Sequence, residues 1–362
     1  MSLSASLGFV RERSAGLAVA GSLGWLAEKA ASSAPISLSP LLYATAFGIL
    51  IGNTIRLFDS EMKLLDPADR GMQFAKKRLL RGGIILYGAK VTFGRMLSIG
   101  LPGLLADLYV VSSTLLIGFS LGRALQLSGA LVTLISTGSA ICGCSAVAAT
   151  QPIIDAESHE APPSHHARVA AAVGVVVLCG TLAMFIYPAL FKLVPSLAAD
   201  PRLMGIYTGA SVHELAGVVA AGNAMGPQVA STALITKLLR VFLLEPWIIA
   251  LYYLGIGSKQ SSEEAFSPSE GKAGKGVPWF AFGFVGVALV NSVWGFSPRV
   301  QRTFTSLSAG FLASAMAALG LDTDLVKVKS LGWKPIALAM VLWVNLLGGG
   351  FLVSRFMVGV FA

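Results

Sequence analysis

Charged residues are scarce in this sequence. Aspartate, glutamate, lysine and arginine make up only 12% of its 362 residues, whereas a soluble domain carries about 25%. Hydrophobic residues account for 55% of the chain, and the mean hydropathy is +0.74. This balance excludes an ordinary soluble domain and is typical of an all-α polytopic membrane protein. A spanning helix needs about 20 mostly apolar residues, so the chain has room for about eleven spans and for no sizeable soluble module.

Cysteine is also rare, with Cys142, Cys144 and Cys179 as the three examples. All three fall in apolar runs, and their spacing fits neither a disulfide framework nor a zinc site. We therefore expect no cofactor and no bound metal. The net charge of +9 is not gathered into a basic patch interleaved with aromatic residues, which argues against a nucleic-acid partner. The lipid bilayer is the partner that this composition indicates.

The apolar runs predict a single membrane domain over residues 1–362. Basic residues concentrate between Arg56 and Arg81, a segment that we interpret as a cytoplasmic loop. This places the N-terminus in the cytoplasm and the C-terminus in the periplasm. A Ser/Glu/Lys/Gly-rich stretch at 258–276 is expected to be a flexible inner linker. The predicted spans are 14–30, 38–55, 82–99, 101–121, 130–154, 167–190, 203–222, 229–255, 277–296, 304–321 and 335–361.

Histidines are few, and three of the four lie between Asp155 and His166. His159, His165 and His166 stand among prolines and acidic residues there. Such a composition is more typical of a solvated loop than of a metal site, so we interpret the segment as an outer loop.

The stretch from Ser136 to Thr150 is rich in small and hydroxyl-bearing residues and makes a poor continuous helix. Its glycines lower helix propensity, and Pro152 is expected to end the run. A helix that breaks at membrane depth survives where protein or a polar cavity surrounds it, and its free N–H groups suit anions. A helix that packs through small residues is the alternative. The predicted substrate-binding residues of this stretch are Ser136, Thr137, Gly138, Ser139, Gly143 and Ser145.

A second unusual span places His213 and Glu214 side by side among apolar residues. Ionisable residues inside a membrane are costly, and histidine titrates near neutral pH, so the pair is a candidate for proton coupling or gating. A packed histidine bonded to the hydroxyl of Ser211 is the alternative. Ser211 is also included among the predicted substrate-binding residues.

Several basic residues fall within predicted spans. Lys90 lies mid-span, and we expect it to supply positive charge to a bound anion. For Arg240 snorkelling toward an interface is the expected behaviour. Lys237 or Arg240 is expected to form a structural ion pair with Glu245. Near the end of another span, Asp322 and Asp324 are followed by Lys327 and Lys329, which indicates a solvated inner face.

Two internal echoes indicate repeats. The segment 82–93 resembles 314–325, and in the predicted topology the two copies run in opposite directions. Inverted repeats of this kind build many secondary transporters. A fainter echo links 138–150 with 209–222, and those two copies run parallel in the same topology.

Three motifs in order carry a family resemblance. They are Leu79–Gly88, Ser139–Ala149, and Gly209–Glu214 with Val218–Gly222. Together they resemble the YeiH family of bacterial inner-membrane proteins, from about Leu42 to near the C-terminus. The resemblance implies sulfate export and an inverted-repeat transporter fold with crossing broken helices, in which 138–150 is one crossing segment. Cys144 and the histidine-bearing loop depart from the family pattern and receive no role.

The leading hypothesis is a secondary membrane transporter that exports a small inorganic oxyanion, with sulfate or a related sulfur anion as substrate and protons as a candidate coupling ion. A cation–proton antiporter or an organic-anion carrier of the same fold is the alternative. A membrane-embedded enzyme that uses Cys142 or Cys144 near His213 is a remote third, because no supporting triad residue is visible. Homo-oligomerisation stays open.

Overall fold

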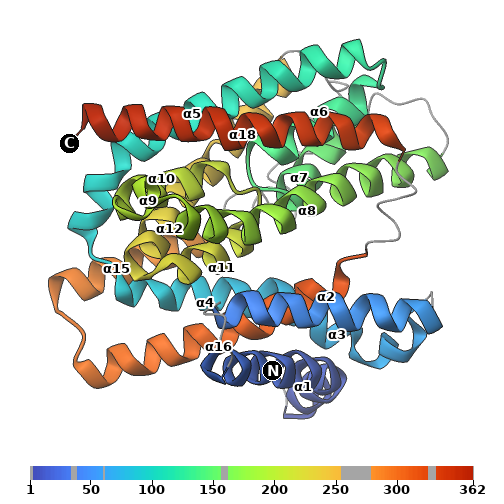
Figure 1. Ribbon diagram of the computed structural model, residues 1–362. Helices are drawn as coiled ribbons and strands as arrows, with labels where there is room; N and C mark the ends of the chain where they lie inside the picture. The colour runs from blue at the N-terminus through green and yellow to red at the C-terminus, as the bar shows by residue number, and fades with distance from the viewer. Residues whose placement is uncertain are drawn as a thin grey trace. The chain divides into compact units, whose positions relative to one another are not determined.

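The computed structural model describes residues 3–33, 39–59, 62–155, 162–253, 279–324 and 332–361. Every regular element within these ranges is a helix (Figure 1), which confirms the predicted all-α class. Five helical stretches are long and apolar enough to cross a membrane, and shorter apolar helices accompany them. The long ones are Pro40–Phe58, Phe93–Ala124, Arg168–Leu193, Pro298–Asp322 and Trp333–Val360.

The chain forms two compact units. Unit 1 comprises residues 1–96 and 279–325, and unit 2 comprises 97–278 and 326–362. The prediction of a single membrane domain over 1–362 remains a prediction. The helical elements of unit 1 are α1 (Leu3–Ser33), α2 (Pro40–Phe58), η1 (Lys63–Leu65), α3 (Asp66–Phe74), η2 (Ala75–Leu79), α4 (Leu80–Tyr87), η3 (Gly88–Lys90), α15 (Trp279–Val293) and α16 (Pro298–Asp322).

Unit 1 is built around α16, which contacts α1, α2 and α4. Gly48 of α2 and Gly320 of α16 lie backbone to backbone, so that a Cβ added at Gly48 would lie 2.9 Å from the Gly320 Cα. Small residues permit this close approach, which compensates for the absence of a hydrophobic driving force between helices in lipid.

The basic segment between Arg56 and Arg81 differs from the predicted loop, because its residues from Lys63 onward are helical through η1, α3, η2 and α4. Its basic residues also pair with the acidic end of α16. Lys76 Nζ lies 2.6 Å from Asp322, and Arg56 Nε lies 3.5 Å from Asp324. The Asp322 side chain is 63% exposed, which agrees with the predicted solvated face, whereas the Asp324 side chain is only 15% exposed. Residues 325–331, including Lys327 and Lys329, lie outside the described residues.

The predicted division between the spans 82–99 and 101–121 was wrong. The helix instead breaks at Gly88–Thr92, and α5 (Phe93–Ala124) continues through Gly100 and Pro102. Side chains of α15 satisfy the broken backbone, since Asn291 Nδ2 donates to the Ala89 carbonyl at 3.0 Å and the Phe93 N–H donates to Ser292 Oγ at 2.7 Å. Because these side chains satisfy the backbone groups, the break costs little free energy. The sequence shows only the glycines and the proline, which predicted the division at a different place.

Unit 2 contains most of α5 and the helices that follow it. These are α6 (Gly129–Ala140), α7 (Cys144–Asp155), α8 (Pro162–Leu193), α9 (Pro195–Ala198), α10 (Pro201–Ser211), α11 (Leu215–Met225), α12 (Pro227–Phe242), α13 (Leu244–Tyr253) and α18 (Trp333–Val360).

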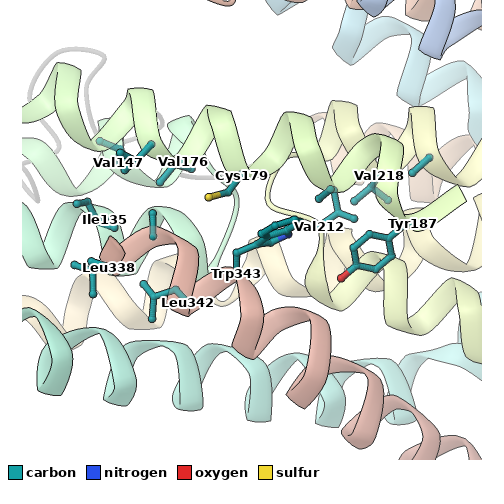
Figure 2. Packing of buried hydrophobic residues seen from close by; sticks show 14 of the residues in the cluster. Ile135, Val147, Val176, Cys179, Tyr187, Val212, Val218, Leu338, Leu342 and Trp343 are labelled. Atoms are coloured by element: carbon teal, nitrogen blue, oxygen red, sulfur yellow. The ribbon is translucent and has the colours of Figure 1, made fainter. Parts of the chain in front are cut away.

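The core of unit 2 joins α6, α7, α8, α9, α10, α11, α12 and α18. Figure 2 shows Val147 of α7 and Val176 of α8 in this cluster, together with Trp343 of α18 and Val212, which follows α10. Val212 lies between the short helices α10 and α11 and is fully buried. Packing of the core therefore fixes the position of the interruption between these two helices.

Two predicted loops have different outcomes. The predicted outer loop was wrong for 162–166, because α8 begins at Pro162 and includes His165 and His166. His159 lies outside the described residues, and so does the predicted linker at 258–276.

The sequence echoes coincide with helix ends. In the first echo, η3 ends at Lys90 and α16 ends at Asp322, which are matching positions of the two copies. In the second echo, 138–150 and 209–222 each contain an interrupted helix. That the copies form an inverted repeat remains a prediction.

Candidate functional site

The first helix break separates α6 from α7. Ile141 leaves the helix with φ −116° and ψ −84°, and Gly143 takes a left-handed φ of +72°. The Gly143 N–H donates to the Gly138 carbonyl at 2.9 Å. A glycine adopts this conformation without the Cβ penalty that other residues incur, which explains why the helix ends here. The interruption that the small residues predicted is therefore present, although Pro152 does not end the run and lies inside α7.

The second break separates α10 from α11. Val212 and Glu214 are extended, with ψ values of 133° and 144°, and α11 begins at Leu215. His213 lies between them and is fully buried. The predicted continuous span 203–222 is therefore two half-helices, and the predicted coupling pair occupies the interruption itself.

Two buried cations of α12 connect the breaks. Lys237 Nζ donates to the carbonyls of Ile141 and Val212, each at 2.7 Å. Arg240 donates from Nε to the Ala140 carbonyl at 2.6 Å. Its Nη2 donates to the Ser139 carbonyl at 2.7 Å, and its Nη1 donates to the Ala210 carbonyl at 2.6 Å. One side of α12 thus binds the C-terminal ends of both α6 and α10.

This arrangement has a direct electrostatic reason. The last carbonyls of a helix lack intrahelical donors and carry the negative end of the helix dipole. Charge-assisted hydrogen bonds from a lysine and an arginine satisfy those carbonyls where water is absent. Lys237 and Arg240 are both 0% exposed, so the snorkelling predicted for Arg240 was wrong. The ion pairs among the described residues do not join either cation to Glu245, and the predicted structural pair was wrong as well.

The side chain of Glu214, the residue before α11, reaches the start of α7. Its Oε1 accepts a hydrogen bond from the Cys144 thiol at 3.0 Å, and a Cβ added at Gly143 would lie 2.6 Å from the Glu214 Cγ. A negative group is favourable at a helix N-terminus. The second break therefore supplies a carboxyl group to the N-terminal end of the half-helix that follows the first break.

Several buried polar atoms of unit 2 have no hydrogen-bond partner among the described residues. They include both ring nitrogens of His213 and the hydroxyls of Ser136 and Ser139. Buried polar groups are normally satisfied, so a group of unsatisfied ones marks a site where a ligand, an ion or water would bind.

Asp107 of α5 is the residue that the sequence reasoning missed. It is 0% exposed, and both of its carboxylate oxygens lack a partner among the described residues. The available signal was a lone acidic residue in the middle of the predicted span 101–121, where an ionisable side chain is by default a candidate for function.

The other predicted ligands of unit 2 are largely engaged within the protein. Thr137 Oγ1 accepts from Trp247 Nε1 at 2.9 Å. Ser145 Oγ donates to the Cys142 carbonyl at 3.0 Å, and Ser211 Oγ donates to the Tyr207 carbonyl at 2.7 Å. Gly138 is inside α6, where an added Cβ would lie 2.8 Å from a methyl group of Val147. The alternative in which Ser211 binds His213 is not what the structure shows.

Lys90 differs from its predicted setting. It belongs to unit 1, is exposed at the end of η3, and lies 5.0 Å from the centre of the Tyr87 ring. The expectation that Lys90 lies in the middle of a continuous span was wrong, because the helix breaks beside it. Its predicted role in substrate binding remains a prediction.

Comparison with known proteins gives a consistent picture. The family described as "Conserved hypothetical protein 698" matches residues 15–339. The inner membrane protein YeiH of Escherichia coli is 39% identical over 313 residues, which cover 86% of this chain and 84% of that protein. A membrane protein of Haemophilus influenzae is 39% identical over 319 residues, covering 88% of both chains. One of Bacteroides thetaiotaomicron is 36% identical over 322 residues, covering 89% of this chain and 91% of its own.

The relatives carry no activity in their names beyond membrane location. Together with the five long apolar helices, they indicate a multi-pass inner-membrane protein. The resemblance predicted from three sequence motifs is confirmed, and this chain belongs to the YeiH family of membrane proteins, the family described as conserved hypothetical protein 698.

Proposed function

We propose that this protein is a secondary carrier that moves a small inorganic oxyanion across the inner membrane, with sulfate or a related sulfur anion as the first substrate to test. One observation carries the proposal. Two interrupted helices meet in unit 2, and the buried Lys237 bonds to a carbonyl of each interruption. Interrupted helices at membrane depth are the usual construction of transporter substrate sites.

The chemistry near the breaks suits an anion. The first N–H groups of α7 and α11 have no acceptors within their own helices, and the positive ends of both helix dipoles lie there. The hydroxyls of Ser136 and Ser139 are buried donors without partners among the described residues. We propose these two serines as the principal side-chain ligands, because Thr137, Ser145 and Ser211 are already bonded within the protein.

The test is radiolabelled sulfate flux in proteoliposomes, with and without a pH gradient, compared between the wild type and His213→Ala. Saturable flux that responds to the gradient is the expected result, and lower flux in the variant would agree with a gating role for His213 at the second break. Well-folded protein that moves no sulfate under any gradient would overturn the sulfate proposal. The same vesicles would then be tested with organic anions.

A cation–proton antiporter of the same fold is the second candidate. It is favoured by two carboxyl groups in unit 2, the partly buried Glu214, which bonds to the start of α7, and the fully buried Asp107 on α5. Vesicles loaded with a pH-sensitive dye separate the two candidates. Proton movement that follows added sodium and ignores sulfate would favour the antiporter.

An enzyme based on a Cys/His pair has no support in the geometry. The Cys144 thiol donates to Glu214, the Cys142 sulfur accepts from Ser145, and the ring nitrogens of His213 bond to no described residue. A cysteine nucleophile requires an adjacent base. We therefore propose a transport role without enzymatic activity, and transport that survives alkylation of both thiols would agree with it.

A further inference from the structure

Asp107 lies on the face of α5 that meets the first break. One turn further along, Val111 packs in the same cluster as Ala140, Ile141 and Val241. One turn earlier, a Cβ added at Gly103 would lie 3.2 Å from Thr236 Oγ1 of α12. Because residues four apart share a helix face, the Asp107 carboxyl is directed toward the region where α12 meets the end of α6.

Two cations act on this carboxyl group. Arg240 is the stronger electrostatic neighbour of Asp107, and Lys237 is the second. Both cations direct hydrogen bonds at backbone carbonyls of the breaks, and neither forms one with Asp107, whose oxygens have no partner among the described residues.

Four other titratable groups share these cations. Cys142, His213 and Glu214 each interact electrostatically with Lys237, and Cys142, His213 and Tyr187 interact with Arg240. Glu214 has a thiol partner in Cys144. Within this set, Asp107 is the acidic group that interacts with two cations and forms no hydrogen bond with any described residue.

The energetics make such a group dependent on the position of the cations. Burying a carboxylate without hydrogen bonds is strongly unfavourable, so the proton stays on the group unless a cation pairs with it directly. If a helix break shifts and Arg240 or Lys237 leaves a carbonyl, the freed donor can pair with Asp107. The proton then leaves for the aqueous side that is open at that moment.

We propose that Asp107 is the proton-binding residue through which this carrier couples anion movement to protons. The inference rests on the transport role proposed above. In one state the carboxyl is neutral while Lys237 and Arg240 hold the helix ends. In the other state a cation pairs with the carboxylate, and one proton has passed from the O–H group to water. Loading from the opposite side reverses the step.

A first experiment tests proton binding without any substrate. Infrared difference spectra of the purified protein in lipid, recorded between acid and alkaline buffer, report the C=O stretch of protonated buried carboxyl groups. The wild type is expected to show such a band, Asp107→Asn to lose it, and Asp107→Glu to shift it. Asp69→Asn serves as the control, because Asp69 is exposed in unit 1. A spectrum unchanged in Asp107→Asn would overturn the proposal.

The same spectra separate the rival sites. A band that disappears in Glu214→Gln but persists in Asp107→Asn would assign the proton to Glu214 and overturn the proposal. If His213→Ala abolishes the response of transport to a pH gradient, and the band assigned to Asp107 does not change with pH, the proton site is His213 and the proposal is overturned.

A second experiment measures coupling in proteoliposomes. Asp107→Asn is expected to retain sulfate counterflow at equal pH and to lose uptake driven by a pH gradient. Gradient-driven uptake that survives in Asp107→Asn would overturn the proposal. If the wild type moves no sulfate but its infrared band behaves as expected, the proton site stands and the substrate proposal alone fails.

Discussion

The Cys144 thiol donates a hydrogen bond to Glu214 Oε1 across 3.0 Å, and this bond ties the start of α7 to the second break. Cys144→Ala removes the donor and leaves a partly buried acceptor short of one partner, so we expect a loss of about 1–3 kcal/mol in the free energy of unfolding. Cys144→Ser restores a donor of similar size and is expected to lose less. Unfolding in lipid–detergent mixtures measures both. A serine variant as unstable as the alanine variant would contradict the assigned bond.

The left-handed conformation of Gly143 gives a second prediction. Gly143→Ala should cost about 1–2 kcal/mol of backbone strain, with a further cost because the new Cβ would meet Glu214 Cγ at 2.6 Å. Gly100→Ala is the matched control, since Gly100 lies inside α5 with open space around an added Cβ. Alanine there is expected to stabilise the helix by up to about 1 kcal/mol. Equal thermal stability of the two variants would contradict the conformation at the break.

Arg240 carries the third prediction, because one guanidinium group bonds to carbonyls at the ends of both α6 and α10. Arg240→Met leaves these buried carbonyls without their donor, and we expect a loss of at least about 3 kcal/mol. Arg240→Lys should recover only part of this, since an ammonium group lacks the planar fork of donors.

The control for this prediction is Arg123→Met. Arg123 is exposed in the last turn of α5, and its replacement is expected to change stability by less than about 0.5 kcal/mol. The folded fraction recovered in lipid, read by size-exclusion chromatography, ranks the variants. An Arg240→Met protein as well folded as Arg123→Met would show that the helix ends do not need the arginine.

Composition and small-residue patterns predicted much of this molecule. Low charge and long apolar runs predicted an all-helical membrane protein, and the glycines of 136–150 predicted an interruption at the correct place. The reason is local. A left-handed glycine such as Gly143 and a run of hydroxyl residues weaken a helix whatever surrounds it.

Partners distant in the sequence could not be predicted. The break at Gly88–Thr92 depends on Asn291 and Ser292, and the roles of Lys237 and Arg240 depend on carbonyls about 100 residues earlier. From the sequence alone, Arg240 was expected to snorkel because it falls within a predicted spanning helix. Only the packing of α12 against both breaks reveals what the guanidinium binds. The same holds for Asp107, because the cations that act on it lie on α12, more than 100 residues later.

The KM for sulfate distinguishes Ser139 from Lys90 as the residue that binds the anion. Ser139 Oγ is a buried donor without a described partner, and a hydrogen bond to a charged ligand is worth about 1.5–3 kcal/mol. Ser139→Ala should therefore raise the KM for sulfate about tenfold or more, with the maximal rate less affected. Lys90 is exposed beside Tyr87, so Lys90→Ala should alter KM only at low ionic strength, where unscreened charge attracts anions. Initial-rate flux at low and high salt measures both effects. If Ser139→Ala leaves KM unchanged while Lys90→Ala raises it at all salt concentrations, the anion binds at the lysine and the serine assignment fails.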